Sequence, residues 1–171
     1  QFDTPGGMSL DVTGALLFVA DTRNSSVRLV NLTNDTTSTF VSGLLTPVDV
    51  TVDSQTNVYV LTQGDGLIRR YDVFGNLGAT VNAATLTLPT AMAFDLNGDL
   101  FVVELGGALK KVTVASGAVT TVVAAGTFSS PRGVAVLEAG AVAVSDTGNH
   151  AVRLVDPNTF AVTLLAGILG T

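Results

Sequence analysis

The sequence predicts an all-β fold made of four copies of one small antiparallel sheet, and three observations predict it. Four prolines, Pro5, Pro47, Pro89 and Pro131, recur at intervals of 42 residues. Stretches of alternating apolar and polar residues follow each proline, as expected for strands with one buried face. Turn-forming residues separate these stretches every eight to twelve residues, and no stretch has helical periodicity.

Each repeat is predicted to contain four short strands in sequence order. The first strands are 6–11, 48–53, 90–95 and 132–137, directly after the marker prolines. The second strands are 17–20, 58–61, 100–103 and 142–145, and the third are 27–30, 68–71, 110–113 and 152–155. A fourth, outer strand completes each repeat, as at 119–123 and 162–165. This arrangement favours a β-propeller of four-stranded antiparallel blades, with a β-solenoid as the alternative.

One propeller domain is expected over residues 1–171, with blades at approximately 1–43, 44–85, 86–127 and 128–171. Four blades leave the closure of the ring open. The chain could close as a four-bladed ring, complete a ring with a partner chain, or belong to a longer array, and we expect part of a larger assembly. Its start at Gln1 fits either a processed mature protein or a piece of a longer one.

Composition excludes several classes of protein. Hydrophobic residues make up 47% of the chain, but the longest apolar stretch, 15–20, is far shorter than the roughly 20 residues that cross a bilayer. No transmembrane segment is therefore expected. The net charge of −6 argues against a nucleic-acid partner, which needs a basic surface. The absence of cysteine excludes disulfides and thiolate metal sites.

The last repeat carries a resemblance to a known family. Its residues Phe128-Ser-Ser-Pro-Arg-Gly-Val-Ala-Val136 and Val144-Ser-Asp-Thr-Gly-Asn-His-Ala-Val-Arg-Leu-Val-Asp-Pro157 resemble the NHL repeat. The first repeat is similar at 2–5, 18–22 and 27–30, whereas the second and third depart at the second turn, 62–65 and 104–107. The resemblance implies a β-propeller, and propellers of this family commonly have about six blades.

An acidic residue stands seven positions before a basic one in three repeats. The pairs are Asp21 with Arg28, Glu104 with Lys111, and Asp146 with Arg153, while the second repeat has Thr62 before Arg69. Across a tight hairpin this spacing places both side chains on neighbouring strands. Because catalytic groups need not recur in every blade, we interpret the pairs as structural ion pairs.

Residues that could perform catalysis are sparse. Enzymes similar in fold, such as amidating lyases and lactonases, surround a central metal with several His or acidic ligands, whereas this chain has one histidine, His150. A Ser-His-Asp site could use only His150 with Asp146, and nothing marks a nucleophile. The stretch 95–99 begins like a calcium loop, but Gly106 stands where the bidentate Glu is needed. We expect no cofactor and no metal.

Three glycosylation sequons fall close together, at Asn24, Asn31 and Asn34. Asn24 lies in a predicted hairpin turn, and the other two lie in the loop after a third strand, where a glycan could project into water. This placement predicts a secreted protein with at least one of the three modified.

These observations lead to one main hypothesis and two alternatives. The main hypothesis is a non-catalytic structural or binding module of a surface or matrix glycoprotein, or of a filament of repeated subunits. Its expected location is extracellular or the cell surface, with protein or glycan partners that include other copies of itself. The first alternative is a metal-dependent propeller enzyme of lyase or lactonase type, in which Asp49, Asp53 and Asp95 would have to serve. The second is an intracellular protein-binding adaptor.

Overall fold

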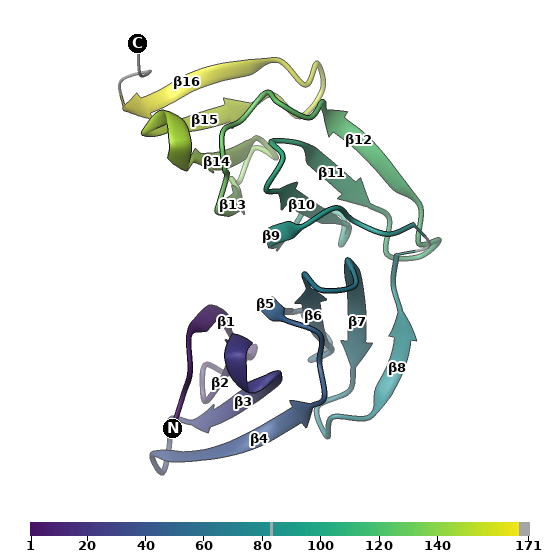
Figure 1. The fold of residues 1–171 in the computed structure, drawn as a ribbon. Coiled ribbons are helices and arrows are strands. Elements are labelled where there is room, and N and C mark those ends of the chain that lie inside the picture. Colours follow the sequence, from purple (N-terminus) through teal and green to yellow (C-terminus); the bar gives the residue numbers. More distant parts are fainter. Residues whose placement is uncertain (83, 168–171) are drawn as a thin grey trace. The chain divides into compact units, whose positions relative to one another are not determined.

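The structure is a computed structural model that describes residues 1–82 and 84–167, and these residues form an all-β fold (Figure 1). Within them lie four antiparallel sheets of four strands each, and every sheet takes its strands in sequence order. The predicted four-stranded propeller blades are therefore confirmed. We name the sheets blades 1 to 4. Residues 168–171, the end of the predicted fourth blade, lie outside the described residues.

The strands begin and end close to the predicted positions. Blade 1 contains β1 (Pro5–Leu10), β2 (Leu16–Asp21), β3 (Ser26–Asn31) and β4 (Thr36–Ser42). Blade 2 contains β5 (Pro47–Val52), β6 (Val58–Thr62), β7 (Leu67–Tyr71) and β8 (Leu77–Thr80). Blade 3 contains β9 (Pro89–Phe94), β10 (Leu100–Glu104), β11 (Leu109–Val112) and β12 (Val119–Val123). Blade 4 contains β13 (Gly133–Val136), β14 (Val142–Asp146), β15 (Ala151–Val155) and β16 (Val162–Gly167).

The turn after the second strand is a single 3₁₀ turn in blades 1 and 4. These turns are η1 (Thr22–Asn24) and η2 (Thr147–Asn149). Each is followed by a residue in the left-handed conformation, Ser25 at φ 51° and His150 at φ 52°. The turns are thus built alike in the two repeats that best match the NHL pattern. Among the described residues, no helix is both long and apolar enough to cross a membrane.

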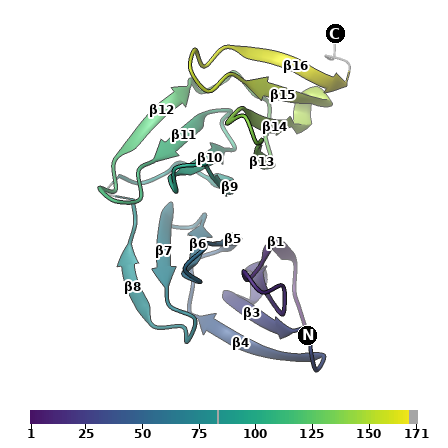
Figure 2. The same ribbon diagram turned by 180° about the vertical axis from the view of Figure 1, so that it is seen from behind.

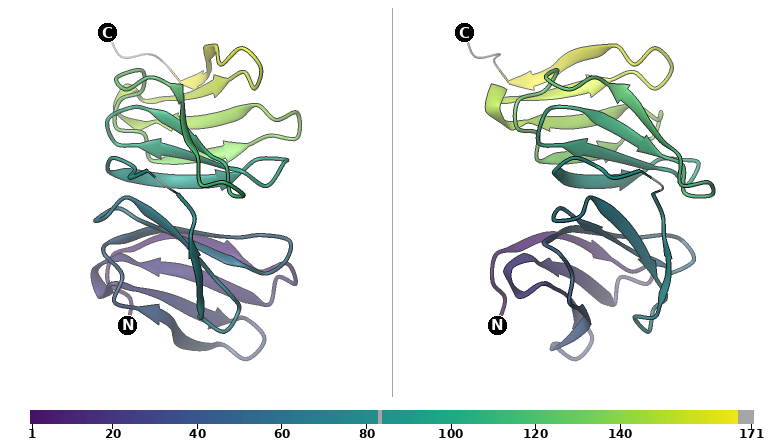
Figure 3. Two further views of the ribbon diagram at one scale, coloured as in Figure 1. Left: turned by 90° about the vertical axis from the view of Figure 1, so that its right-hand side faces the viewer. Right: turned by 45° about the vertical axis from the view of Figure 1, so that its right-hand side comes forward.

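The chain divides into two compact units, residues 1–81 with blades 1 and 2, and residues 82–171 with blades 3 and 4. In each unit the first strands of the two blades lie side by side, β1 beside β5 and β9 beside β13 (Figure 2). The turned views show the two sheets of each unit facing one another (Figure 3). In each unit we call the face of the first blade that meets the second blade its forward face, and the face of the second blade that meets the first its rear face. The corresponding faces of the other blades carry the same names.

The core of the first unit lies between the forward face of blade 1 and the rear face of blade 2. Phe18 and Val27 from blade 1 pack against Val50, Val60 and Tyr71 from blade 2. The rings of Phe18 and Phe40 meet edge to face with centroids 4.9 Å apart, a favourable geometry for aromatic pairs. The alternation along each strand thus places one set of side chains on each face.

The second unit repeats this arrangement. Phe101 and Val103 on the forward face of blade 3 pack against Val142, Val144 and Val155 on the rear face of blade 4. The first strands also meet directly, because Thr90 Oγ1 donates a 2.8 Å hydrogen bond to the Pro131 carbonyl. Apolar burial between blades, and not within one sheet, is therefore what holds each unit together.

Close approach of β1 to β5 explains the two glycines after the first marker proline. A Cβ on Gly6 would lie 2.5 Å from the Val48 carbonyl oxygen, and one on Gly7 would overlap the Asp49 carboxylate. A side chain at either position would push the two blades apart. The sequence Pro5-Gly-Gly7 is thus a requirement of blade packing.

We expect Phe18→Ala to lower the free energy of unfolding by about 3 to 5 kcal/mol, because it opens a cavity between blades 1 and 2. The matched control is Phe74→Ala, since Phe74 is 84% exposed and its truncation removes little buried surface. Urea unfolding followed by circular dichroism measures both. Equal losses for the two variants would contradict the packing described above.

Candidate functional site

A buried carboxylate at the end of the second strand joins three segments of chain in blades 1 and 4. The Asp146 carboxylate accepts hydrogen bonds from the Ser129 backbone N–H at 2.6 Å, from Asn149 Nδ2 at 2.9 Å and from Arg153 Nε at 3.1 Å. It thereby ties the segment that enters the blade to the 3₁₀ turn and to the third strand. The side chain of Asp146 is fully buried, so these donors replace its lost hydration.

Blade 1 repeats this set of contacts around a buried carboxylate, which we call the carboxylate clamp, with one longer contact. Asp21 accepts from the Asp3 backbone N–H and from Asn24 Nδ2, both at 2.8 Å. The predicted partner Arg28 lies farther away, with Nε 3.9 Å from Asp21 Oδ2, and its Nη1 donates to Thr39 Oγ1 at 2.6 Å. Asp21 with Arg28 and Asp146 with Arg153 thus lie together as ion pairs.

The predicted pair of Glu104 with Lys111 in blade 3 is wrong. Glu104 Oε1 accepts from the Thr87 backbone N–H at 2.7 Å, and the lysine nearest to its carboxylate is Lys110, with Nζ 4.0 Å from Oε2. The reason is the length of the turn. In blade 3, Val103 pairs with the residue six positions later, Leu109. The equivalent residues of the other blades pair with the residue seven positions later, as Ala20 with Val27 and Ser145 with Val152. The paired turn of blade 3 is therefore one residue shorter. Losing one residue shifts every later side chain to the opposite face, so Lys110 takes the place of Arg28 and Arg153.

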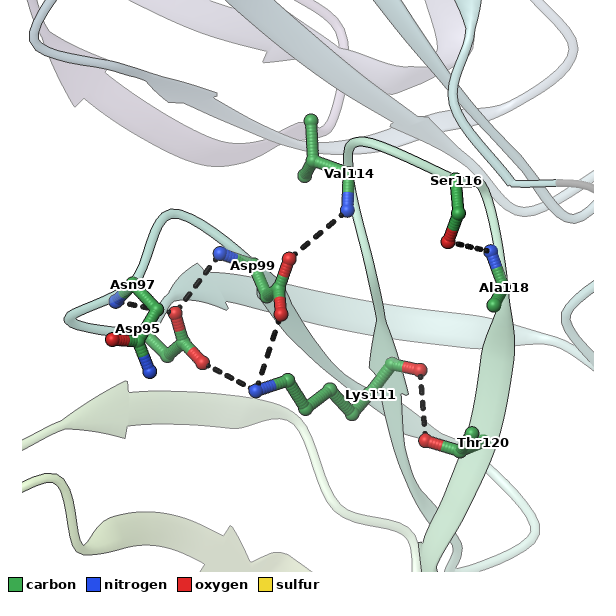
Figure 4. A network of polar contacts seen from close by, with 8 residues as sticks. All are labelled: Asp95, Asn97, Asp99, Lys111, Val114, Ser116, Ala118 and Thr120. Carbon is green, nitrogen blue, oxygen red and sulfur yellow. Dashed lines mark hydrogen bonds and ion pairs between the residues drawn. The ribbon is translucent and has the colours of Figure 1, made fainter.

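Lys111 instead lies between two carboxylates at the β9–β10 turn (Figure 4). Its Nζ is 2.7 Å from Asp95 Oδ2 and 3.2 Å from Asp99 Oδ2. Asp95 also accepts from the backbone N–H groups of Asn97 and Asp99. The turn that begins like a calcium loop therefore holds an ammonium group between its carboxylates, and Asp95 closes a hairpin turn in the way that Asp commonly does.

Blade 2 has no acid at the end of its second strand and supplies the carboxylate from the turn. Asp65 pairs with Arg69 Nη2 at 2.5 Å, and Thr62 Oγ1 accepts from Arg69 Nη1 at 2.8 Å. The seven-residue spacing of acid and base does not identify Asp65, Asp99 or Lys110 as partners in these contacts. The departures of the second and third repeats at 62–65 and 104–107 were the signal that could have located two of them.

The pKa values of these acids follow from their partners. Burial by itself would raise the pKa of Asp146, but hydrogen bonds from Asn149, Ser129 N and Arg153 outweigh it and lower the pKa. Burial also opposes the lowering of the Asp95 pKa, which the hydrogen bond from Lys111 and two backbone N–H groups bring about. These two groups are therefore ionised at neutral pH and act as fixed acceptors.

The three sequon asparagines lie at two different turns of blade 1. Asn24 is exposed, but its Nδ2, the atom to which a glycan would attach, donates to Asp21 Oδ2 at 2.8 Å and to the Gln1 carbonyl at 3.2 Å. Asn31 is the last residue of β3, and Asn34 lies in the β3–β4 loop. Asn31 Oδ1 accepts from Thr33 N, and Asn34 Oδ1 accepts from the Thr36 hydroxyl. Within the described part of the chain, Nδ2 of Asn31 and of Asn34 makes no hydrogen bond.

The residues considered for catalysis lie apart, and each has a different structural position. The Asp49 carboxylate accepts from Val50 N at 2.9 Å on β5, and Asp53 accepts from Asn57 Nδ2 at 2.7 Å in the β5–β6 turn. His150 is exposed at the left-handed position after η2, and Asp146 is hydrogen bonded to other groups. Across residues 1–82 and 84–167, no three His, Cys, Asp or Glu side chains are grouped so that they could hold a metal ion.

Replacing Asp146 by Asn should lower the free energy of unfolding at neutral pH by about 1 to 3 kcal/mol, because Arg153 loses its buried acceptor. Since the pKa of Asp146 is lowered by folding, its contribution is present above about pH 4 and is lost as the pH falls through the folded-state pKa. The gap between wild type and D146N in urea unfolding should therefore shrink on acidification. A gap that stays constant, or an equal effect of Asp35→Asn at an exposed loop, would refute this role.

Lys111→Met should destabilise the fold by about 1 to 2 kcal/mol, because Asp95 and Asp99 would then face each other without a cation. Lys110→Met should cost less than about 0.5 kcal/mol, since its pair with Glu104 is long and partly exposed. Thermal or urea unfolding of the two variants measures the difference. A larger loss of stability in Lys110→Met than in Lys111→Met would contradict the placement of Lys111 between Asp95 and Asp99.

Comparison with known protein families finds one match. The NHL repeat model matches residues 128–153, which span β13, β14, η2 and the start of β15. None of the curated protein sequences compared with the chain matches it.

Solved structures share the fold at low sequence identity. A chain of a nidogen/laminin complex matches with TM-score 0.83 and 16% identity over 99% of this chain and 65% of that chain. A putative gluconolactonase matches with TM-score 0.79 and 15% identity, over 98% of this chain and 64% of that one. A streptogramin B lyase matches with TM-score 0.78 and 15% identity, over 94% of this chain and 53% of that one. The chain thus spans less than two thirds of each relative, and the likeness shows the fold.

The fold and the family match point to the same class of protein. The described residues contain four blades of four antiparallel strands, and blade 1 repeats the carboxylate clamp of the matched fourth repeat. The described residues form four β-propeller blades, and the fourth of them matches the NHL repeat over residues 128–153.

Proposed function

We propose that the chain is a non-catalytic extracellular module that gives shape and a binding surface to a surface or matrix glycoprotein. The observation that carries this proposal is the β3–β4 hairpin of blade 1, where residues 31–36, from the end of β3 to the start of β4, hold two of the three sequons. Asn34 is exposed at this hairpin, and its Thr36 hydroxyl donates to its Oδ1 at 2.7 Å. A glycan on Nδ2 would leave that contact intact and project into water.

The polar contacts at the turns support a scaffold role. Asp21, Glu104 and Asp146 each accept a hydrogen bond from the backbone N–H of the segment that enters their blade. Such bonds hold the turns in fixed positions, as a presented binding surface requires. The same hydrogen bonds give these carboxylates a structural role, because each carboxylate is buried and accepts from donors of the protein itself.

The similarity to a chain of a nidogen/laminin complex supports a partner of protein class. We propose protein or glycan partners for this chain on the same basis. The expected location is the extracellular space or the cell surface.

We expect the protein, when expressed in secreting eukaryotic cells, to carry an N-linked glycan on Asn34 and none on Asn24. A glycan on Asn24 would replace an N–H that donates to the buried Asp21 carboxylate or to Gln1 O. Intact-mass measurement before and after enzymatic removal of N-glycans, with peptide mapping, identifies the occupied sites. Thr36→Ala should abolish the modification of Asn34, and Ser26→Ala, at the sequon of Asn24, should leave the glycan mass unchanged. A chain without glycan at all three asparagines would contradict the extracellular part of the proposal.

A second candidate function is a propeller enzyme, which the similarity to a streptogramin B lyase and a putative gluconolactonase favours. This function would need a metal or a reactive group within reach of several polar side chains. Elemental analysis of the purified protein separates the two proposals. A stoichiometric metal would favour the enzyme, and lactone or lyase activity that depends on it would replace the binding role.

A further inference from the structure

The β9–β10 turn of blade 3 contains a reactive pair of residues that the other blades lack. It holds the only Asn-Gly pair in the chain, Asn97 with Gly98. In an Asn-Gly pair the glycine nitrogen is close to the asparagine amide carbon, and no side chain on the glycine shields that nitrogen. At the position of Asn97 the same turn of the other blades has Thr13, Gln55 and Ala139.

Both residues of the pair are accessible to water. Asn97 and Gly98 are exposed at the tip of the hairpin. The Asn97 backbone N–H is bonded to Asp95, but within residues 84–167 and 1–82 its side-chain amide makes no hydrogen bond (Figure 4). Gly98 has φ +84°, and a Cβ on it would meet nothing within 4 Å. The left-handed conformation favours glycine here, so the turn keeps the unshielded nitrogen next to Asn97.

One backbone hydrogen bond holds the Gly98 nitrogen in the closed turn. Its N–H donates to the Asp95 carbonyl at 3.2 Å. The equivalent bonds of the other three blades are 2.8 to 3.0 Å long and are donated by Gly14, Thr56 and Gly140. The bond at the tip of the β9–β10 turn is therefore the longest of the four. Opening it frees the nitrogen, and the tips of exposed loops open at little cost in free energy.

Lys111 restrains the same turn at its base (Figure 4). Its Nζ lies 2.7 Å from Asp95 Oδ2 and 3.2 Å from Asp99 Oδ2, so one cation joins the residues on either side of the reactive pair. The Asp95 carboxylate in turn accepts from the backbone N–H groups of Asn97 and Asp99. Without Lys111 the two carboxylates would repel each other, and this repulsion favours the open turn.

We propose that Asn97 is a site of spontaneous deamidation and that the contact of Lys111 with Asp95 and Asp99 sets its rate. The Gly98 nitrogen attacks Cγ of Asn97 and forms a new C–N bond. The side-chain nitrogen leaves as ammonia and carries away the proton of the Gly98 N–H. Water then opens the resulting succinimide ring at one of its two carbonyl carbons. The products are aspartate and isoaspartate, in which the main chain runs through the former side chain.

Each product disturbs the turn in which it forms. Aspartate adds a negative charge beside Asp95 and Asp99. Isoaspartate also lengthens the main chain by one carbon atom inside a turn that closes with Asp95 N donating to Asp99 O at 2.7 Å. The longer turn does not fit the same set of hydrogen bonds. The reaction therefore loosens the contacts of Lys111 and changes the β9–β10 turn of blade 3 as the protein ages.

Peptide mapping with mass spectrometry, after incubation of the full chain at mildly alkaline pH, tests the proposal. It measures the loss of the amide at Asn97 and at Asn158 in the same digest, and chromatography separates the isoaspartyl and aspartyl peptides. Asn158 is the internal reference, because it is also exposed in a turn but precedes Thr159. We expect Asn97 to react at least about ten times faster, which requires only a small difference in activation free energy. Equal rates at the two asparagines would overturn the proposal.

Variants of the two neighbouring lysines test the role of Lys111. Lys111→Met should speed the reaction at Asn97 by about 5- to 30-fold, the shift of the opening equilibrium that its expected loss of stability gives. Lys111→Arg keeps the cation and should react at nearly the wild-type rate. Lys110→Met is the matched control, because Lys110 contacts Thr121 and Glu104 instead of the turn.

The comparison is made at a temperature at which thermal unfolding shows every variant to be folded. In urea, where the turn is absent, all four chains should react at one rate. A folded K111M chain that reacts as slowly as wild type, or a difference between the chains that persists in urea, would overturn the control by Lys111. The reaction involves no glycan and no partner, so its outcome is separate from that of the proposed extracellular function.

Discussion

Every blade is a single sheet, so its apolar side chains leave water only when another blade covers them. This constraint explains why the strands alternate so regularly and why both units contain a pair of sheets. Phe18 and Phe101 occupy equivalent positions on forward faces, and both are buried against valines of the next blade.

The carboxylate clamp is a second, polar set of contacts that holds the turns of each blade in place. Burial of Asp21 and Asp146 would be unfavourable without donors, and each is surrounded by a backbone N–H, an asparagine amide and an arginine. Blades 2 and 3 reach a similar result with different residues, Asp65 from the turn and Glu104 with its longer side chain. The contact between a carboxylate and its donors thus recurs in all four repeats, although the residues that form it differ.

The register of neighbouring strands decides which charged side chains come together in these sheets. One residue fewer in the β10–β11 turn moves Lys110 toward Glu104 and Lys111 toward Asp95 and Asp99. A turn that begins like a cation site is consequently filled by a lysine ammonium. Likewise the two sequons of the β3–β4 loop keep free amide nitrogens, whereas Asn24 uses its own in the clamp. Chemically identical motifs therefore have different roles according to the backbone that carries them.

The amino-acid sequence by itself determined the four blades, the order of their strands and the inward face of each strand. It did so because the proline period and the alternation of apolar residues are local signals that the strand geometry requires. Two of the three acid–base pairs also followed from spacing alone, since their turns have equal length. Only the tertiary structure decided the partner of Glu104, the hydrogen bond from Asn24 to Asp21 and the burial of Phe18 and Phe101 against the next blade. These features depend on the length of a turn and on which face another blade covers, and neither can be read from the residues concerned.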